Sequence, residues 1–143
     1  MSATYTLTEH PEALAVVRLA PGAELPEWAE SSSLLSVTAT AGETSLVCAA
    51  DCVPASASSQ QPFTAFEVAG PLDFALTGLL AVLLAPLAEA GISVFVVSTF
   101  DTDWILVPSE ASAAAAEVWR RRGDTVLPEP VMPAPSPSGE ATP

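Results

Sequence analysis

The sequence predicts an α+β fold built from two units that share one order of elements. In the second half, the hydrophobic pattern assigns a strand, a helix, two strands and a second helix. The first half repeats this order more weakly. A shift of 60 residues superposes the apolar positions of two hairpins, placing Val37, Leu46 and Val47 on Val97, Leu106 and Val107. With 143 residues, 50% of them hydrophobic, the chain can bury a core without disulfides or metal.

The first unit, residues 1–62, is expected to contain a strand at Leu14–Leu19, where apolar and β-branched residues follow one another. Residues 24–30 are expected to form one or two helical turns, which would be the shortened counterpart of the helix in the second unit. A β-hairpin follows, with strands at 34–40 and 44–49 around a turn that contains glycine.

The segment 53–62 (VPASASSQQP) is small, polar and bounded by prolines, so it predicts a linker between the two units. The second unit, residues 63–123, begins with a short strand at 63–68. Asp73 then stands where an N-cap is expected, ahead of a leucine-rich helix over 74–90 that ends at a glycine.

The segment 92–99 is apolar on both faces and rich in β-branched residues, which predicts a central strand. A turn leads to a further strand at 103–107. Ser109 is expected to cap a helix that runs through Trp119 and ends in three arginines, which suit the negative end of the helix dipole. Residues 124–143 are rich in proline and have little to bury, so they predict a disordered tail.

Composition excludes several classes of function. The chain has 4 basic and 17 acidic residues and a net charge of −13, so it offers no basic surface for nucleic acid or for anionic membranes. The uncharged stretch 74–88 is shorter than the about 20 residues of a membrane span and contains a proline. The first twelve residues show no pattern of a signal peptide, so a soluble, cytoplasmic protein is expected.

The sequence contains few residues that could bind a metal or act in catalysis. Cys48 and Cys52 are separated by three intervening residues and have no other soft ligand nearby, so two reduced thiols are expected and a zinc site is not. His10, the only histidine, is expected to be exposed near the terminus. No nucleophile has an evident base and no phosphate-binding glycine loop occurs, so a non-enzyme without cofactor or metal is expected.

Three motifs of the second half occur together: Gly70-Pro71-Leu72-Asp73-Phe74, the segment 86–94 (PLAEAGISV), and Ser98-Thr99-Phe100-Asp101-Thr102-Asp103. With the hairpin sequence 36–48 (SVTATAGETSLVC), they resemble the ACT-domain proteins. The resemblance is to the small tandem-ACT group, which includes bacterial amino-acid-binding proteins and is related to the animal CASTOR arginine sensors. It covers about residues 12–122.

The resemblance implies two ferredoxin-like modules of βαββαβ form, the first with a shortened helix. It also implies a small effector, very often an amino acid, held between two modules. Matched position by position, the ligand contacts would be Gly70, Asp73 and Asp103, with backbone groups of Ser93 and Val94 from a neighbouring module. Because the first module departs from the family pattern, pairing of two second modules across a homodimer is implied as the way to complete the site.

Elementary chemistry agrees with such a site, but it also accounts for the acidic residues without a ligand. Free amide groups at a helix start would receive a carboxylate, and Gly70 would let the ligand approach the backbone. Asp73 and Asp103 would attract an ammonium or a cationic side chain. Capping alone is sufficient reason for Asp73, and turn chemistry for Asp103. The leading hypothesis is a non-catalytic amino-acid-binding regulatory protein; the alternative is a ligand-free oligomerisation or protein-interaction module.

Overall fold

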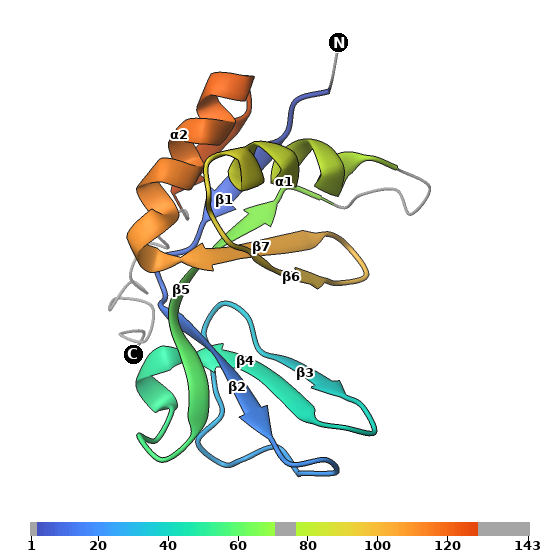
Figure 1. Cartoon of the computed structure of the whole chain (residues 1–143), viewed down its shortest axis with the longest axis vertical. Helices are drawn as coiled ribbons and strands as arrows, with labels where there is room; N and C mark the ends of the chain where they lie inside the picture. The colour runs from blue at the N-terminus through green and yellow to red at the C-terminus, as the bar shows by residue number, and fades with distance from the viewer. Residues whose placement is uncertain (1–2, 71–76, 129–143) are drawn as a thin grey trace, which may run out of the picture.

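The computed structural model describes residues 3–70 and 77–128 of the chain. These residues form an eight-stranded sheet that bends into two parts, as Figure 1 shows. The long strand β5 (Ser58–Val68) belongs to both parts, because its first half pairs with β2 (Leu14–Leu19) and its second half with β7 (Asp103–Pro108). The linker predicted at 53–62 is therefore wrong over 58–62. Backbone pairing with β2 orders this polar stretch, which carries no hydrophobic signal of its own.

The N-terminal part of the sheet is antiparallel, in the order β3 (Ser36–Ala39), β4 (Thr44–Ala49), β2 and the first half of β5. The predicted hairpin and the predicted strand at Leu14–Leu19 are confirmed. A single turn of 3₁₀ helix, η1 (Ala50–Cys52), follows β4. The helical turns predicted at 24–30 are wrong: this segment has only a tight turn at residues 27–28, where the Ala29 amide donates to the Pro26 carbonyl at 3.0 Å. So short a segment cannot overcome the cost of helix nucleation by itself.

The C-terminal part of the sheet has two strands from the ends of the chain. Its order is β6 (Phe95–Ser98), β7, the second half of β5, β1 (Thr6–Glu9) and β8 (Thr125–Pro128). Strand β1 is antiparallel to β5 and parallel to β8. No strand was predicted at Thr6–Glu9. The tail predicted at 124–143 is wrong over Thr125–Pro128, and residues 129–143 lie outside the described part.

Two helices cover one face of the C-terminal sheet (Figure 1). They are α1 (Leu79–Glu89) and α2 (Ser112–Arg122), the latter preceded by the 3₁₀ turn η2 (Ser109–Ala111). The fully buried Trp119 joins them, since its indole N–H donates to the Leu83 carbonyl at 2.9 Å. Neither of these described helices is long and apolar enough to span a bilayer.

The other face of the C-terminal sheet packs on the N-terminal sheet. Alternate residues of β7 divide between the two faces: Ile105 and Val107 lie under the helices, whereas Trp104 and Leu106 pack with Leu14 and Val47 of the N-terminal sheet. Strand β6 is also apolar on both faces. It was predicted as a central strand, but among the described strands it pairs only with β7, so it is an edge strand. Its Phe95 and Val97 pack in the cluster between the two sheets.

One carboxylate fixes the loop that covers the outer face of the N-terminal sheet. Glu12 accepts hydrogen bonds of 2.5 Å from the hydroxyls of Ser31 and Ser33. It accepts further bonds of 2.9–3.1 Å from the amides of Ser32 and Ser33 and from the Ser32 hydroxyl. Partial burial acts to raise the pKa of Glu12, but these hydrogen bonds outweigh it and lower the pKa to about 2. The chain before this serine turn carries Trp28 onto the sheet, against the cluster formed by Val17 and its neighbours.

Candidate ligand-binding site

Two of the residues implied by the resemblance lie at one end of the C-terminal sheet. Gly70 follows β5, and Asp103 begins β7. The two strands pair with Glu67 opposite Trp104, so the end of β5 is level with the start of β7. The buried hydroxyl of Thr102 donates to the Val68 carbonyl at 2.5 Å and holds the β6–β7 turn against the end of β5.

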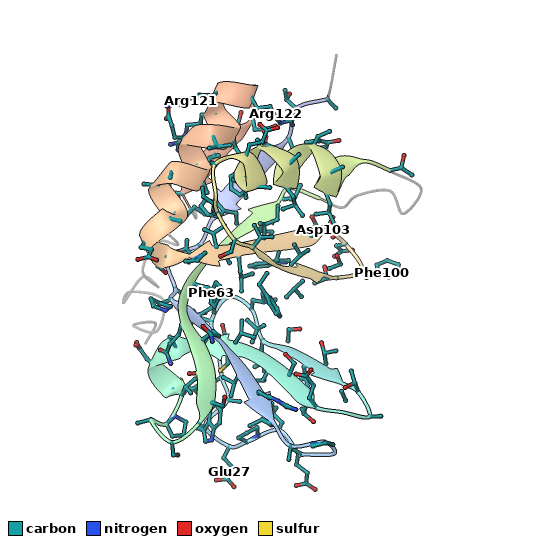
Figure 2. The ribbon with its side chains drawn as sticks, in the orientation of Figure 1. Glu27, Phe63, Phe100, Asp103, Arg121 and Arg122 are labelled. Carbon is teal, nitrogen blue, oxygen red and sulfur yellow. The ribbon has the colours of Figure 1, made fainter. Side chains whose placement is uncertain are left out.

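The carboxylate of Asp103 is held in place by its own hairpin. It accepts a hydrogen bond of 2.5 Å from the Ser98 hydroxyl, across the last pair of residues before the turn. By strand alternation, Asp103 points to the same face as Ile105, which is the face that the helices cover. Figure 2 shows Asp103 and Phe100 at the turn end of this hairpin, and Figure 1 shows the start of α1 above the same end. This end of the sheet therefore presents a half-buried carboxylate on the face that the helices cover.

The start of α1 differs from the prediction. The helix begins at Leu79, and its N-cap is Gly78, which has a positive φ of 83° and no side-chain cap. The Val82 amide donates to the Gly78 carbonyl at 3.0 Å. The helix was predicted to begin at Phe74 with Asp73 as its cap; Asp73 and residues 71–76 lie outside the described residues. A left-handed residue is needed at this position, and glycine adopts that conformation without strain.

Ser93 and Val94 lie at the other end of β6. Ser98 pairs with Asp103, whereas Phe95 pairs with Leu106, so the strand runs away from the Asp103 end towards Val94. At about 3.3 Å per residue, Val94 is about 13 Å from the Asp103 end. Both residues are exposed, Val94 by 37%. One chain thus has Gly70 and Asp103 at the same end of the C-terminal sheet and Ser93 and Val94 at the other end of β6.

The environment of His10 was not foreseen from the sequence. The prediction of an exposed residue is wrong, since His10 is 7% exposed. Its ring stacks on Trp104 with centroids 4.7 Å apart, and its Nε2 lies 3.0 Å from a carboxylate oxygen of Glu67. No sequence pattern indicated this burial, because His10 follows β1, and β1 has only one buried apolar residue, Leu7, so it was not recognised as a strand.

The two cysteines are free thiols, as the sequence indicated. Burial raises the pKa of Cys48 above its usual value. Desolvation also raises the pKa of Cys52, together with its hydrogen bond to Glu30 at 3.4 Å. Both shifts disfavour the reactive thiolate. Among residues 3–70 and 77–128, no group of three His, Cys, Asp or Glu side chains is placed to hold a metal ion.

Comparison with known proteins gives matches to both halves of the chain. The ACT domain family matches residues 58–120, and a family described as an N-terminal domain matches residues 12–56. The crystal structure of protein Atu0741 from Agrobacterium tumefaciens is 30% identical in sequence. It covers 94% of this chain and 100% of its own length, with a TM-score of 0.84.

Two further similarities are partial or more distant. The human cytosolic arginine sensor for mTORC1 subunit 1 is 42% identical over 52 residues, which are 36% of this chain. The chain spans only 16% of the length of that relative. The regulatory subunit of aspartate kinase from Thermus flavus is 9% identical, with a TM-score of 0.59 over 84% of this chain and 98% of its own. This last similarity concerns the fold alone.

Proposed function

Because the chain belongs to the same family as the Agrobacterium protein Atu0741 and matches the ACT domain over residues 58–120, we propose that it is a non-catalytic, cytoplasmic regulatory protein that binds a free amino acid. The observation that supports the proposal is the register of β5 and β7, which puts Gly70, just after β5, and Asp103, at the start of β7, at the same end of the C-terminal sheet. The arginine-sensor relatives support an amino acid as the ligand class, with arginine as the first candidate.

The chemistry of this end suits a ligand with an amine. The Asp103 carboxylate would receive the ligand's ammonium or a cationic side chain, and such a charge-assisted hydrogen bond contributes about 1.5–3 kcal/mol. The backbone around Gly70 would receive the carboxylate, because glycine leaves room for close approach. Asp73, which follows in the same motif, is proposed as a second acidic contact.

The position of Ser93 and Val94 supports a dimer. Both residues are exposed, and Val94 lies about 13 Å from the Asp103 end of the same chain. We therefore propose that their backbone groups reach the ligand from the ACT domain of a second copy, so that a homodimer holds each ligand between two chains. Such a symmetric pairing would form two equivalent sites.

Thermal unfolding in the presence of each of the twenty amino acids tests the proposal. A ligand at 100 times its Kd adds about 2.7 kcal/mol of stability. Asp103→Asn should weaken the binding of the active amino acid about 10- to 100-fold, because the charge is lost while the shape is kept. Asp101→Asn is the matched control: it removes the same charge from an exposed residue of the same turn.

Native mass spectrometry of the purified protein tests the dimer and retained ligand together. A dimer that carries two ligands is the expected result. A dimer without stabilisation by any amino acid would instead support the ligand-free oligomerisation module. A monomer that binds with full affinity would contradict the role of Ser93 and Val94.

A further inference from the structure

A row of polar side chains crosses the N-terminal sheet on the face turned towards the C-terminal sheet. Thr38 of β3 is opposite Ser45 of β4, Ser45 is opposite Arg18 of β2, and Arg18 is opposite Ser58 of β5. Directly opposed residues point to the same face, and Arg18 shares that face with Leu14 and Val16 by alternation. The face is thus apolar near the junction of the two sheets and polar towards its open end.

This polar end is hollowed. A hollow of about 240 Å³ is lined by Arg18, Glu43, Ser45, Ser58 and Gln60, among other residues. Glu43 is the last residue of the β3–β4 turn, two positions before Ser45, and lines the hollow together with Arg18. One hollow is therefore lined by a residue with a guanidinium, from β2, and a residue with a carboxylate, from the β3–β4 turn.

Neither charge is neutralised within the described part of the chain. The ion pairs among residues 3–70 and 77–128 include neither Arg18 nor Glu43, and the only hydrogen bond of the Arg18 side chain there is a long one, 3.4 Å, to the Gly42 carbonyl. The other three arginines all lie at the end of α2. There Arg120 donates to the Val126 carbonyl, Arg121 pairs with Glu117, and Arg122 pairs with Asp124. Among the described residues, Arg121 and Arg122 are thus paired with carboxylates and Arg120 is bound to a backbone carbonyl beside them, whereas Arg18 lines the hollow without an acidic partner.

We propose that this hollow is a second ligand site, which binds the head group of a free α-amino acid. The planar guanidinium of Arg18 takes the carboxylate through paired hydrogen bonds, and the Glu43 carboxylate takes the ammonium. The hydroxyls of Ser45 and Ser58 and the amide of Gln60 supply further hydrogen-bond partners. A carboxylate and an ammonium on one carbon match two opposite charges in one hollow. This site is separate from the one proposed at Asp103, and either can exist without the other.

Three probes of similar size test the recognition: L-alanine carries both charged groups, propionate carries only the carboxylate, and ethylamine carries only the ammonium. Their binding is followed by the amide shifts of residues 16–19, 43–46 and 58–60 in ¹H–¹⁵N NMR spectra of the full chain. We expect L-alanine to move these amides at a concentration at least about tenfold below that needed for propionate or ethylamine. Equal affinity of propionate and L-alanine would overturn the role of Glu43, and no shift with L-alanine would overturn the site.

Variants separate this site from the one at Asp103. Arg18→Gln should abolish the shifts of these amides, and Arg18→Lys should retain part of them because the charge remains. Arg121→Gln removes the same charge from the surface of α2 and should change nothing. Arg18 is exposed, so its variants should leave the amide signals of the other residues unchanged.

Asp103→Asn should leave the L-alanine shifts of residues 16–19 intact even if it abolishes binding at its own site. Undiminished shifts in Arg18→Gln would overturn the proposal.

Discussion

The two hairpins of the molecule, β3–β4 and β6–β7, have the same type of turn but are covered by different elements. In each, four residues separate the strands and the first of them is a threonine. The Thr40 amide donates to the Glu43 carbonyl at 2.9 Å, and the Thr99 amide donates to the Thr102 carbonyl at 2.8 Å. The threonine hydroxyls accept from the amides of Glu43 and Thr102 at 3.1 and 3.2 Å. The two hairpins thus repeat one another in structure. The offset between equivalent residues, Thr40 and Thr99, is 59 positions and not the predicted 60.

The two hairpins are covered on their outer faces by different kinds of structure, helices in one case and loops in the other. Helices α1 and α2 cover the second hairpin with a leucine-rich surface and Trp119. The first hairpin is covered by loops, which bring Trp28 to it and are tied down by Glu12 and its serines. A helix satisfies its own backbone, but a loop needs partners from elsewhere. The same hairpin can therefore be retained while its cover changes from hydrophobic packing to one carboxylate with several hydrogen bonds.

The largest effect is expected from removing the anchor of the helical cover. Trp119→Ala should lower the free energy of unfolding by about 3–5 kcal/mol, because it empties a fully buried site and breaks the bond to the Leu83 carbonyl. Trp28→Ala is the comparison in the loop cover and should cost about 1–2 kcal/mol, since Trp28 is only partly buried. Urea unfolding measures both. Equal losses would contradict the difference between the two covers.

Glu12→Gln should cost about 1–3 kcal/mol at neutral pH, because a neutral amide cannot accept the same set of hydrogen bonds as a carboxylate. The pKa of Glu12 is lowered from 4.5 to about 2, so its contribution is complete above about pH 4.5 and is lost as the pH falls towards 2. The difference between wild type and variant in urea midpoints should therefore shrink across this range. Glu24→Gln, in an exposed part of the same loop region, is the control. A difference that does not change with pH would remove Glu12 from this role.

The smallest effect is expected at Thr44, the first residue of β4 and the counterpart of Asp103 at the start of β7. Its hydroxyl is buried and has no hydrogen-bond partner among the described residues. Thr44→Val should be neutral or should stabilise the protein by up to about 1 kcal/mol, because no bond is lost. Thr102→Val is the contrasting change: it leaves the Val68 carbonyl unpaired and should cost about 1–3 kcal/mol. Thermal unfolding compares the pair, and a destabilised Thr44→Val would reveal a partner for that hydroxyl.

Local pattern predicted the elements whose side chains decide their structure. The strands Leu14–Leu19 and Thr44–Ala49 were placed correctly, and so was the end of α2 at Gly123, where the Asp124 amide closes the helix on the Trp119 carbonyl at 3.0 Å. The strands β1, β8 and the first half of β5 were missed. Each has few buried apolar residues and is ordered by pairing with a distant strand, which a local window cannot detect.

The sequence motifs indicated which residues belong to the candidate site, but not how the fold places them relative to one another. The motif residues Gly70 and Asp103 lie at the same end of the sheet because β5 and β7 pair, and that pairing follows from the order of the elements. Ser93 and Val94 come from the same motifs, yet the antiparallel hairpin carries them to the far end of β6. The hollow at Arg18 had no local signal at all. It depends on the register of three strands, which brings Arg18 and Ser45 together from distant parts of the chain.

The parallel pairing of β1 with β8 determines when the fold can be completed. The Tyr5 amide donates to the Asp124 carboxylate at 2.8 Å, across 119 positions of sequence, and Arg122 binds the same carboxylate. Few contacts in a chain of this length can join residues that are further apart in sequence, and closing so large a loop slows folding. During synthesis, β1 must remain without its parallel neighbour until residues 125–128 have emerged. The two ends of the described chain thus act as a single late step, after both hairpins can already have formed.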